Sequence, residues 1–241
     1  MKIFAFSIKN EKKFVHLTCN IILVATLLFV SILSFSSPSI EAYTASGGAY
    51  YYGDKSSGKV SLMINVYWGT EYIDSMLKTL MENGVKTTFF VGGSWASKNS
   101  DILFKIINDG HEIANHGYFH KDHTKLTLKQ GESEISATHN LVKTLAGIEM
   151  NLFAPPSGSV NSTVVTAAEN LGYKTIMWSK DTIDWRDKDE DLIFNRATKN
   201  ISSGDLILMH PTEKTALALP KIIKEILSKN LTITFVSEVI S

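Results

Sequence analysis

Lys86–Gly93 reads KTTFFVGG, and Asp109–His120 reads DGHEIANHGYFH. The run of threonine, phenylalanine and valine in the first stretch is typical of a short buried strand. A helical pattern covers Ile102–Asp109, and a second short strand pattern follows at Glu112–Ala114. The order strand, helix, strand predicts two parallel strands joined by a crossover helix.

The same alternation extends along the chain from Val60 onward. Strands are expected at Val60–Val66, Thr87–Val91, Glu112–Ala114, Leu152–Ala154, Thr175–Trp178, Leu206–Met209 and Thr232–Val236. Helices are expected at Tyr72–Asn83, Ile102–Asp109, Leu128–Leu145, Ser162–Leu171, Glu190–Asn200 and Glu213–Ser228. We therefore predict an α/β fold, a distorted (β/α) barrel of about seven parallel strands, with functional residues on the loops after the strands.

The front of the chain has the layout of a secretory signal. Lysines are followed by an apolar run at Ile21–Phe35 and then by serine and proline. We assign residues 1–42 to a signal peptide or an N-terminal membrane anchor, residues 43–59 to a linker or a strand lying across the domain, and residues 60–241 to the folded domain. This layout predicts a protein that is secreted or held at the cell surface.

The composition limits the possible partners. Hydrophobic residues make up 44% of the 241 residues, which is enough for one buried core. Twenty basic and 22 acidic residues follow residue 42, and they form no basic stripe, so we expect no nucleic-acid partner. Cys19 is the only cysteine, which leaves no disulfide to stabilise the domain.

Histidines follow the strand expected at Glu112–Ala114. His116 and His120 are four residues apart, and His123 comes shortly after. If this segment forms a helical turn, residues i and i+4 project from one face, and neutral imidazoles are good ligands for Zn²⁺ and similar divalent ions. Taken alone, the pattern also fits surface histidines with no such role.

The next strand is followed by FAPPSGS at Phe153–Ser159. Pro155 and Pro156 stiffen a turn, and Gly158 permits unusual backbone dihedrals. A functional interpretation is a rigid wall beside a cleft, with the backbone amide near Ser157 facing an oxyanion. The alternative is an ordinary loop.

Two further segments carry ionisable residues at strand ends. MWSKDTIDW supplies Asp181, Asp184 and Trp185, and LILMHP supplies Leu208 and His210. A buried carboxylate could orient the imidazole of His210. The alternatives are turn capping and core packing for Asp184 and Trp185, and a structural histidine for His210.

Together these motifs appear in the order HxxxH, PPxG, DW and LxH, each after an expected strand. In this arrangement the chain resembles carbohydrate esterase family 4, the polysaccharide deacetylases, over essentially all of Val60–Ser241. The stretches VYWGTEY and APPSGS look like a sporulation-associated branch of that family.

The resemblance implies roles for individual residues. His116 and His120 match two ligands of a divalent metal, commonly zinc, which activates water against an acetyl group on a polysaccharide. His210 matches the general acid, and Asp184 matches its carboxylate partner. Pro155, Pro156 and Ser157 match a substrate-binding wall, and Trp185 and Leu208 match the apolar pocket for the acetyl methyl group.

The chain departs from the family pattern at one subsite. The first motif, of the form TFDD, aligns with Met63–Val66, so Asn65 occupies the position of the catalytic base and Val66 that of the metal-binding aspartate. Neither side chain can perform that role, because an amide does not accept a proton near neutral pH and valine has no donor atom. Ala154 stands where the family has an arginine. Glu71 could supply a replacement acid, or simply complement the dipole of a helix N-terminus.

Two functions follow as expectations. The first is an exported deacetylase-like hydrolase acting on N-acetyl groups of cell-wall glycan, such as peptidoglycan or chitin-like oligomers, with weakened activity and incomplete metal occupancy. The second is a catalytically silent glycan-binding or assembly protein that reuses the same cleft.

Overall fold

The computed structural model describes residues 16, 18–26 and 48–241. Internal contacts divide the chain into two units, Met1–Ala42 and Tyr43–Ser241, and each is described by itself. In the first unit, residues 16 and 18–26 are helical and exposed, and Cys19 is a free, exposed thiol. Across the described part of the chain, no helix combines the length and the apolar character needed to cross a membrane. The rest of the predicted leader lies outside the described residues.

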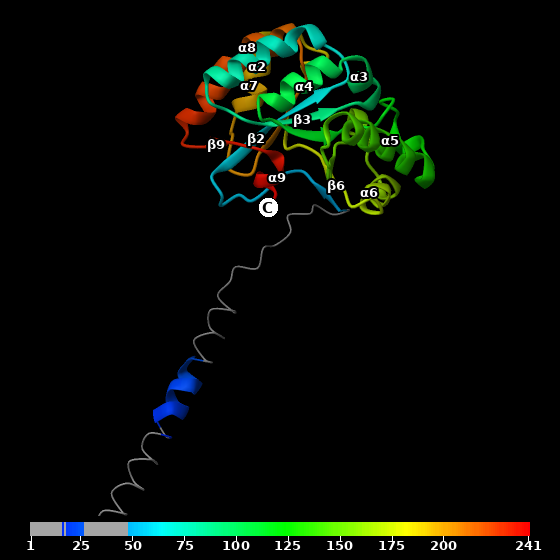
Figure 1. Cartoon of the computed structure of the whole chain (residues 1–241). Helices are drawn as coiled ribbons and strands as arrows, with labels where there is room; N and C mark the ends of the chain where they lie inside the picture. The colour runs from blue at the N-terminus through cyan, green and yellow to red at the C-terminus, as the bar shows by residue number, and fades with distance from the viewer. Residues whose placement is uncertain (1–15, 17, 27–47) are drawn as a thin grey trace, which may run out of the picture. The chain divides into compact units, whose positions relative to one another are not determined.

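The second unit is built on one curled sheet of parallel strands, which forms a half-barrel (Figure 1). Its strands are β1 (Ala49–Tyr50), β2 (Lys59–Val66), β3 (Thr88–Val91), β4 (Glu112–Asn115), β5 (Leu152–Phe153), β6 (Lys174–Ile176), β7 (Lys180–Asp181), β8 (Leu206–Met209) and β9 (Thr232–Ile233). They are ordered β1-β6-β5-β4-β3-β2-β8-β7, and β9 pairs with the start of β2. The predicted α/β fold is confirmed.

All seven expected strands are present. Of two further strands, β1 lies in the segment for which a linker or a strand was expected, and β7 was not predicted. β1 extends the sheet by pairing with β6, and β7 extends it by pairing with β8. β7 consists of two charged residues, Lys180 and Asp181, so it shows no hydrophobic pattern in the sequence. Of the segment Tyr43–Lys59, residues 48–59 are described, and they contain β1 and a bridge between Tyr52 and Asp205.

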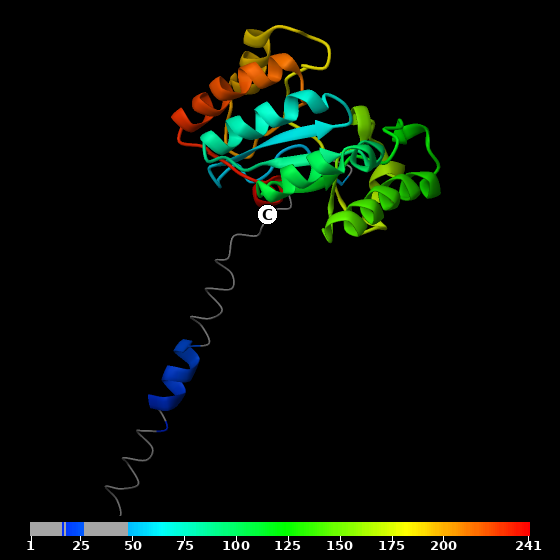
Figure 2. The ribbon, with the colours of Figure 1, turned by 45° about the horizontal axis from the view of Figure 1, so that its top comes forward.

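Helices cover the convex face of the sheet (Figure 2). They are α2 (Thr70–Glu82), α3 (Gly93–Lys98), α4 (Ser100–Asn108), α5 (Leu128–Ala146), α6 (Ser162–Glu169), α7 (Glu190–Thr198) and α8 (Glu213–Ser228), with short turns η1 (His123–Lys125) and η2 (Pro156–Gly158) and a last helix α9 (Val236–Val239). Side-chain caps explain several of the starts, including a capping box between Thr127 and Gln130 at α5.

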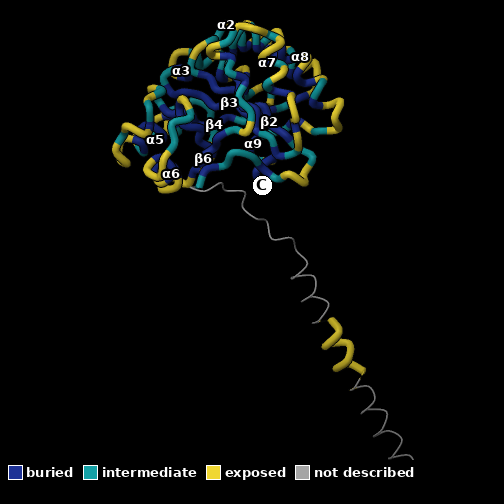
Figure 3. Tube along the Cα trace, turned by 180° about the vertical axis from the view of Figure 1, so that it is seen from behind, coloured by how far each residue is buried: buried dark blue, intermediate teal, exposed yellow. Residues whose placement is uncertain are grey.

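The central strand β2 separates two layers of core. Leu62 and Ile64 are fully buried in the layer between the sheet and the helices. Met63 points to the other side and is buried among residues inside the half-barrel. Figure 3 shows the strands as a buried interior with exposed residues on the outer surfaces of the helices. Because side chains alternate along a strand, β2 presents one set of residues to the concave side, and Asn65 continues that set.

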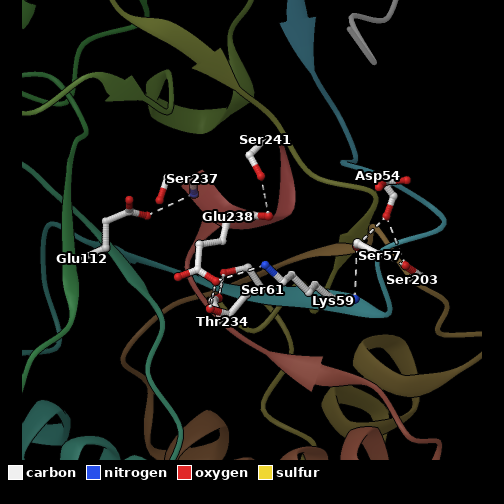
Figure 4. Close-up of polar contacts among 10 residues, drawn as sticks. All are labelled: Asp54, Ser57, Lys59, Ser61, Glu112, Ser203, Thr234, Ser237, Glu238 and Ser241. Atoms are coloured by element: carbon white, nitrogen blue, oxygen red, sulfur yellow. Dashed lines mark hydrogen bonds and ion pairs between the residues drawn. The ribbon is translucent and has the colours of Figure 1, made fainter. Parts of the chain in front are cut away.

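The C-terminal segment closes the end of the half-barrel where the strands begin. Glu238 accepts hydrogen bonds from Lys59 at 3.3 Å and from Thr234 at 2.9 Å (Figure 4). The backbone amide of Ser237 donates to Glu112 at 3.3 Å. Val236 and Val239 of α9 are fully buried in the inner core, so α9 fills the base of the half-barrel. The opposite end, where the strands finish, stays open for a site.

Candidate functional site

A cavity of about 370 Å³ lies where the strands end. The residues that line it come from five separate segments of the chain: Asn65, Trp68, His116, His120, Ser157, Trp178, Asp181, Trp185, Leu208 and His210. Seven of these were singled out from the sequence as candidate site residues. The structure therefore brings His116, His120 and His210 to one cavity, as the family resemblance implies.

His116 is held in one orientation by the backbone. Its Nδ1 donates a hydrogen bond of 2.7 Å to the carbonyl oxygen of Ala154, so in the neutral ring Nε2 carries the lone pair. The residue is 2% exposed, and burial lowers the pKa of His116 to about 3. Burial also lowers the pKa of His120, whose ring lies 5.1 Å from that of His116. Both imidazoles are thus neutral near pH 7.

The segment that carries these histidines is a loop, which corrects the helical turn expected from their spacing. Gly117 and His120 both have positive φ, at 71° and 52°, and the amide of Gly117 donates to the Asn115 side chain at 2.9 Å. His120 reaches the cavity because the chain folds back on itself, and its ring stacks on Tyr67 at 4.7 Å. His123 is buried against Phe153 and does not line the cavity.

Asn65 faces the cavity at the end of β2. It is 3% exposed, and its Oδ1 atom has no hydrogen-bond partner among the described residues. An unpaired buried acceptor costs about 1 to 3 kcal/mol, which favours a water molecule or a ligand at this position. The neighbouring Val66 is fully buried in the layer between sheet and helices and does not line the cavity.

His210 and Asp184 form a buried pair on the other side of the cavity. The His210 Nδ1 lies 2.7 Å from Asp184 Oδ1, and the His210 backbone amide donates to Asp184 Oδ2 at 2.7 Å. The hydroxyl of Thr215 donates to the same Oδ2 at 2.5 Å. This carboxylate therefore fixes both the ring and the backbone of His210 and leaves Nε2 to exchange a proton with a ligand.

The turn with the paired prolines supports the cavity from behind. Pro155 and Pro156 are buried and do not line it, whereas Ser157, with φ of 56°, does. Gly158 also has positive φ, at 66°, and a Cβ atom there would lie 2.8 Å from the ring of Trp178. A glycine is required because the turn presses closely on this indole.

Two tryptophans in the lining were not predicted as site residues. Trp68 follows β2 and stacks on His210, with ring planes 8° apart and centroids separated by 5.7 Å. Trp178 follows β6 and contacts Gly158. Trp68 follows an expected strand, which is the signal that could have identified it, whereas Trp178 was expected to be the last residue of a strand that in fact ends at Ile176. Glu71 lies in the first turn of α2 and lines a neighbouring hollow instead of the cavity.

The described residues do not complete a catalytic metal site. His116 and His120 supply two neutral imidazoles, but no group of three histidine, cysteine, aspartate or glutamate side chains comes close enough together within residues 16, 18–26 and 48–241. Catalytic zinc sites have three protein ligands. The residues therefore fit a two-histidine half of such a site, and Val66 supplies no donor for the rest.

Comparisons with known proteins identify relatives over most of the domain. A family model for polysaccharide deacetylase matches residues 52–176. YlxY of Bacillus subtilis, a protein without a described activity, is 37% identical over 201 residues, which are 83% of this chain and 63% of YlxY. The peptidoglycan-N-acetylglucosamine deacetylase of Bacillus cereus is 31% identical over 73% of this chain, which spans 66% of that enzyme.

A solved structure shares this fold. It is a CE4 family pseudoenzyme from Bacillus anthracis, 32% identical, with a TM-score of 0.78 over 82% of this chain and 70% of its own. A mutant of that protein, which has the same TM-score, is described as having restored enzymatic activity.

Proposed function

Because the chain belongs to the polysaccharide deacetylase family, carbohydrate esterase family 4, we propose that it binds N-acetylated cell-wall glycan in the cavity and turns it over little or not at all. One observation carries this proposal. Asn65 lies in the cavity at the position where the family has its base, and its neutral amide cannot take a proton from water.

The metal half of the site supports the same conclusion. A divalent ion such as zinc would supply a polarised acetyl carbonyl and a water molecule of lowered pKa. Here two imidazoles are the protein ligands, so we propose that the ion is held weakly and at low occupancy. The site therefore lacks the catalytic base and also holds less of the metal charge that a working hydrolytic centre needs.

The cavity retains the parts that recognise an acetylated sugar. Leu208 and Trp185 offer apolar surface for a methyl group, and His210 presents Nε2 to a polar atom of the ligand. Peptidoglycan is the substrate named for the deacetylase relative from Bacillus cereus, which favours it as the glycan for this chain. We propose these contacts as the glycan-binding residues.

A second candidate function is slow deacetylation. The specific observation in its favour is the hydrogen-bonded pair of Asp184 and His210, which is the arrangement required for protonating a departing amine. Loss of a general base costs typically 10² to 10⁴ in rate, so residual turnover would be slow.

The location of the protein is part of the proposal. The lysines and apolar run in Met1–Ala42 support export and attachment to, or release from, the membrane surface. The stretches VYWGTEY and APPSGS support a role in sporulation.

The test combines binding with acetate release. Purified protein, with zinc added, would be titrated with N-acetylglucosamine oligomers and with peptide-free peptidoglycan glycan, and acetate would be measured at high protein concentration. We expect saturable binding and at most trace acetate. Trp185→Ala should weaken binding, whereas Phe104→Ala, an exposed aromatic on α4, should not. Rapid acetate release would contradict the proposal, and so would the absence of binding to either glycan.

A further inference from the structure

A second hollow adjoins the cavity. Its volume is about 420 Å³, and it is lined by residues of α2, of the loop before α7 and of the start of α8, including Glu71, Lys188, Glu213 and Lys214. Trp68 and Trp185 line both hollows. A glycan that fills the first cavity would therefore pass these two indoles and enter the second hollow.

The two indoles are partly exposed aromatic surfaces beside both hollows. Trp68 and Trp185 are 42% and 57% exposed, although each is held by a neighbour. Trp68 stacks on His210, and Trp185 lies 5.8 Å from the guanidinium of Arg186. Arg186 is itself held by both carboxylate oxygens of Asp187, at 2.9 and 3.0 Å. Partly exposed aromatic rings are suited to the flat apolar face of a sugar.

Most charges in this second hollow are already compensated. Asp184 is bound by His210 and Thr215, and Asp187 is paired with Arg186 and Arg196. Glu213 and Lys214 lie 3.6 Å apart.

Two charged side chains remain available in the hollow. In the part of the chain that the structure describes, Lys188 and Glu71 are the lining charges without an ion-pair partner. The hollow thus offers a ligand one free ammonium group and one free carboxylate.

From this arrangement we infer that the second hollow binds a sugar unit bearing a carboxylate, next to the acetylated unit in the cavity. Lys188 pairs with that carboxylate, Glu71 accepts hydrogen bonds from sugar hydroxyls, and the ring of the unit lies on Trp185. This inference rests on the proposed function and narrows its ligand class. The protein would prefer a glycan whose sugars carry an ether-linked carboxylate, as N-acetylmuramic acid does, over neutral chitin-like oligomers.

The experiment compares two ligands of equal length, a neutral N-acetylglucosamine tetramer and a peptide-free tetramer that alternates N-acetylglucosamine with N-acetylmuramic acid. The unmodified full chain should bind the second more tightly. Lys188→Gln should lower the affinity for the carboxylate-bearing ligand about two- to fivefold, which is the range typical of an exposed ion pair. It should leave the affinity for the neutral ligand unchanged. Added salt should erode the same preference.

Two further variants complete the comparison. Lys224→Gln removes an exposed lysine of α8 outside the hollow and should change neither affinity. Glu71→Gln should weaken the binding of both ligands to the same extent, because both carry hydroxyl groups. Equal affinity of the unmodified chain for the two tetramers, or no effect of Lys188→Gln, would overturn the inference while the proposed function stands. If neither tetramer binds, the proposed function itself fails.

Discussion

The Oδ1 atom of Asp184 lies 2.7 Å from Nδ1 of His210, and its other oxygen receives the backbone amide of the same histidine. One buried carboxylate therefore fixes both the ring and the main chain at the end of β8. This relationship makes Asp184 a structural residue as well as a positioning residue for whatever His210 does in the cavity.

Asp184→Asn should destabilise the domain. The amide keeps the shape of the carboxylate, but its NH₂ group would face one of the three donors that Asp184 now accepts. We expect a loss of about 1 to 3 kcal/mol in the free energy of unfolding, measured by urea denaturation. Asp74→Asn, which removes an exposed pair with Lys105, should cost less than about 1 kcal/mol. Equal effects of the two substitutions would argue against a buried anchoring role for Asp184.

Gly158→Ala should disturb the cavity wall. The new Cβ atom would meet the Trp178 ring at 2.8 Å, in addition to the strain of a φ of 66°. We expect a loss of more than about 2 kcal/mol in stability and weaker glycan binding. Gly147→Ala is the matched control, because Gly147 also has positive φ but a Cβ there meets nothing within 4 Å. The control should lose about 1 kcal/mol and keep its affinity.

Stability should fall as the pH drops below 6.5, because buried histidines must be protonated on unfolding. Burial, with the charge of Lys86, lowers the pKa of His111 to about 4, and its Nδ1 accepts a hydrogen bond from the Thr87 amide. Between pH 6.5 and 4 the unfolded chain binds the proton and the folded chain does not, so stability rises with pH across that window.

The size of this effect can be measured through His111→Asn, which keeps an acceptor for Thr87 but does not titrate. For the unmodified chain, His111 should contribute on the order of 2 kcal/mol of destabilisation between pH 7 and pH 5. Urea denaturation at both pH values should show a correspondingly smaller difference in the variant. An unchanged pH dependence would exclude His111 as a source of acid sensitivity.

Restoring the family residues should produce a hydrolase. The variant Asn65→Asp, Val66→Asp, Ala154→Arg supplies the base, a third metal ligand and the orienting arginine implied by the resemblance. With zinc added, we expect acetate release at least about 10²-fold above that of the unmodified chain. The same variant with His210→Ala serves as the control and should be slow.

Val66→Asp alone gives an independent readout of the metal. Val66 is fully buried among apolar side chains, so an unpaired carboxylate there should lower the melting temperature. Zinc should reverse part of this loss if the carboxylate reaches His116 and His120.

A folded triple variant that binds zinc but releases no acetate would show that the cleft differs from the enzymes in more than these positions.

The sequence supported the fold and much of the cavity for a physical reason. Parallel strands bring their ends to one edge, so residues after β4, β5 and β8 could be expected to meet although they are far apart in the chain. The two-residue strand β7 could not be predicted, because Lys180 and Asp181 form no hydrophobic pattern and the strand is defined by its pairing with β8.

Local backbone geometry was the main source of error within the site. The spacing of His116 and His120 suggested a helix, yet Gly117 and His120 adopt positive φ and form a loop. Trp68 and Trp178 were missed because a tryptophan near a strand usually belongs to the core. Only the arrangement in space shows that both indoles face the opening.

Helix α9 packs at the end of the half-barrel where the strands begin, so the C-terminal segment lies away from the cavity. Ser237 and Glu238 lie beside Glu112 and Lys59, at the end of the half-barrel remote from the cavity. A tag or surface tether joined after Ser241 would leave the mouth free to receive polymeric sugar. Removal of the last six residues, by contrast, would take Val236 and Val239 out of the buried cluster that contains Met63 and Phe90.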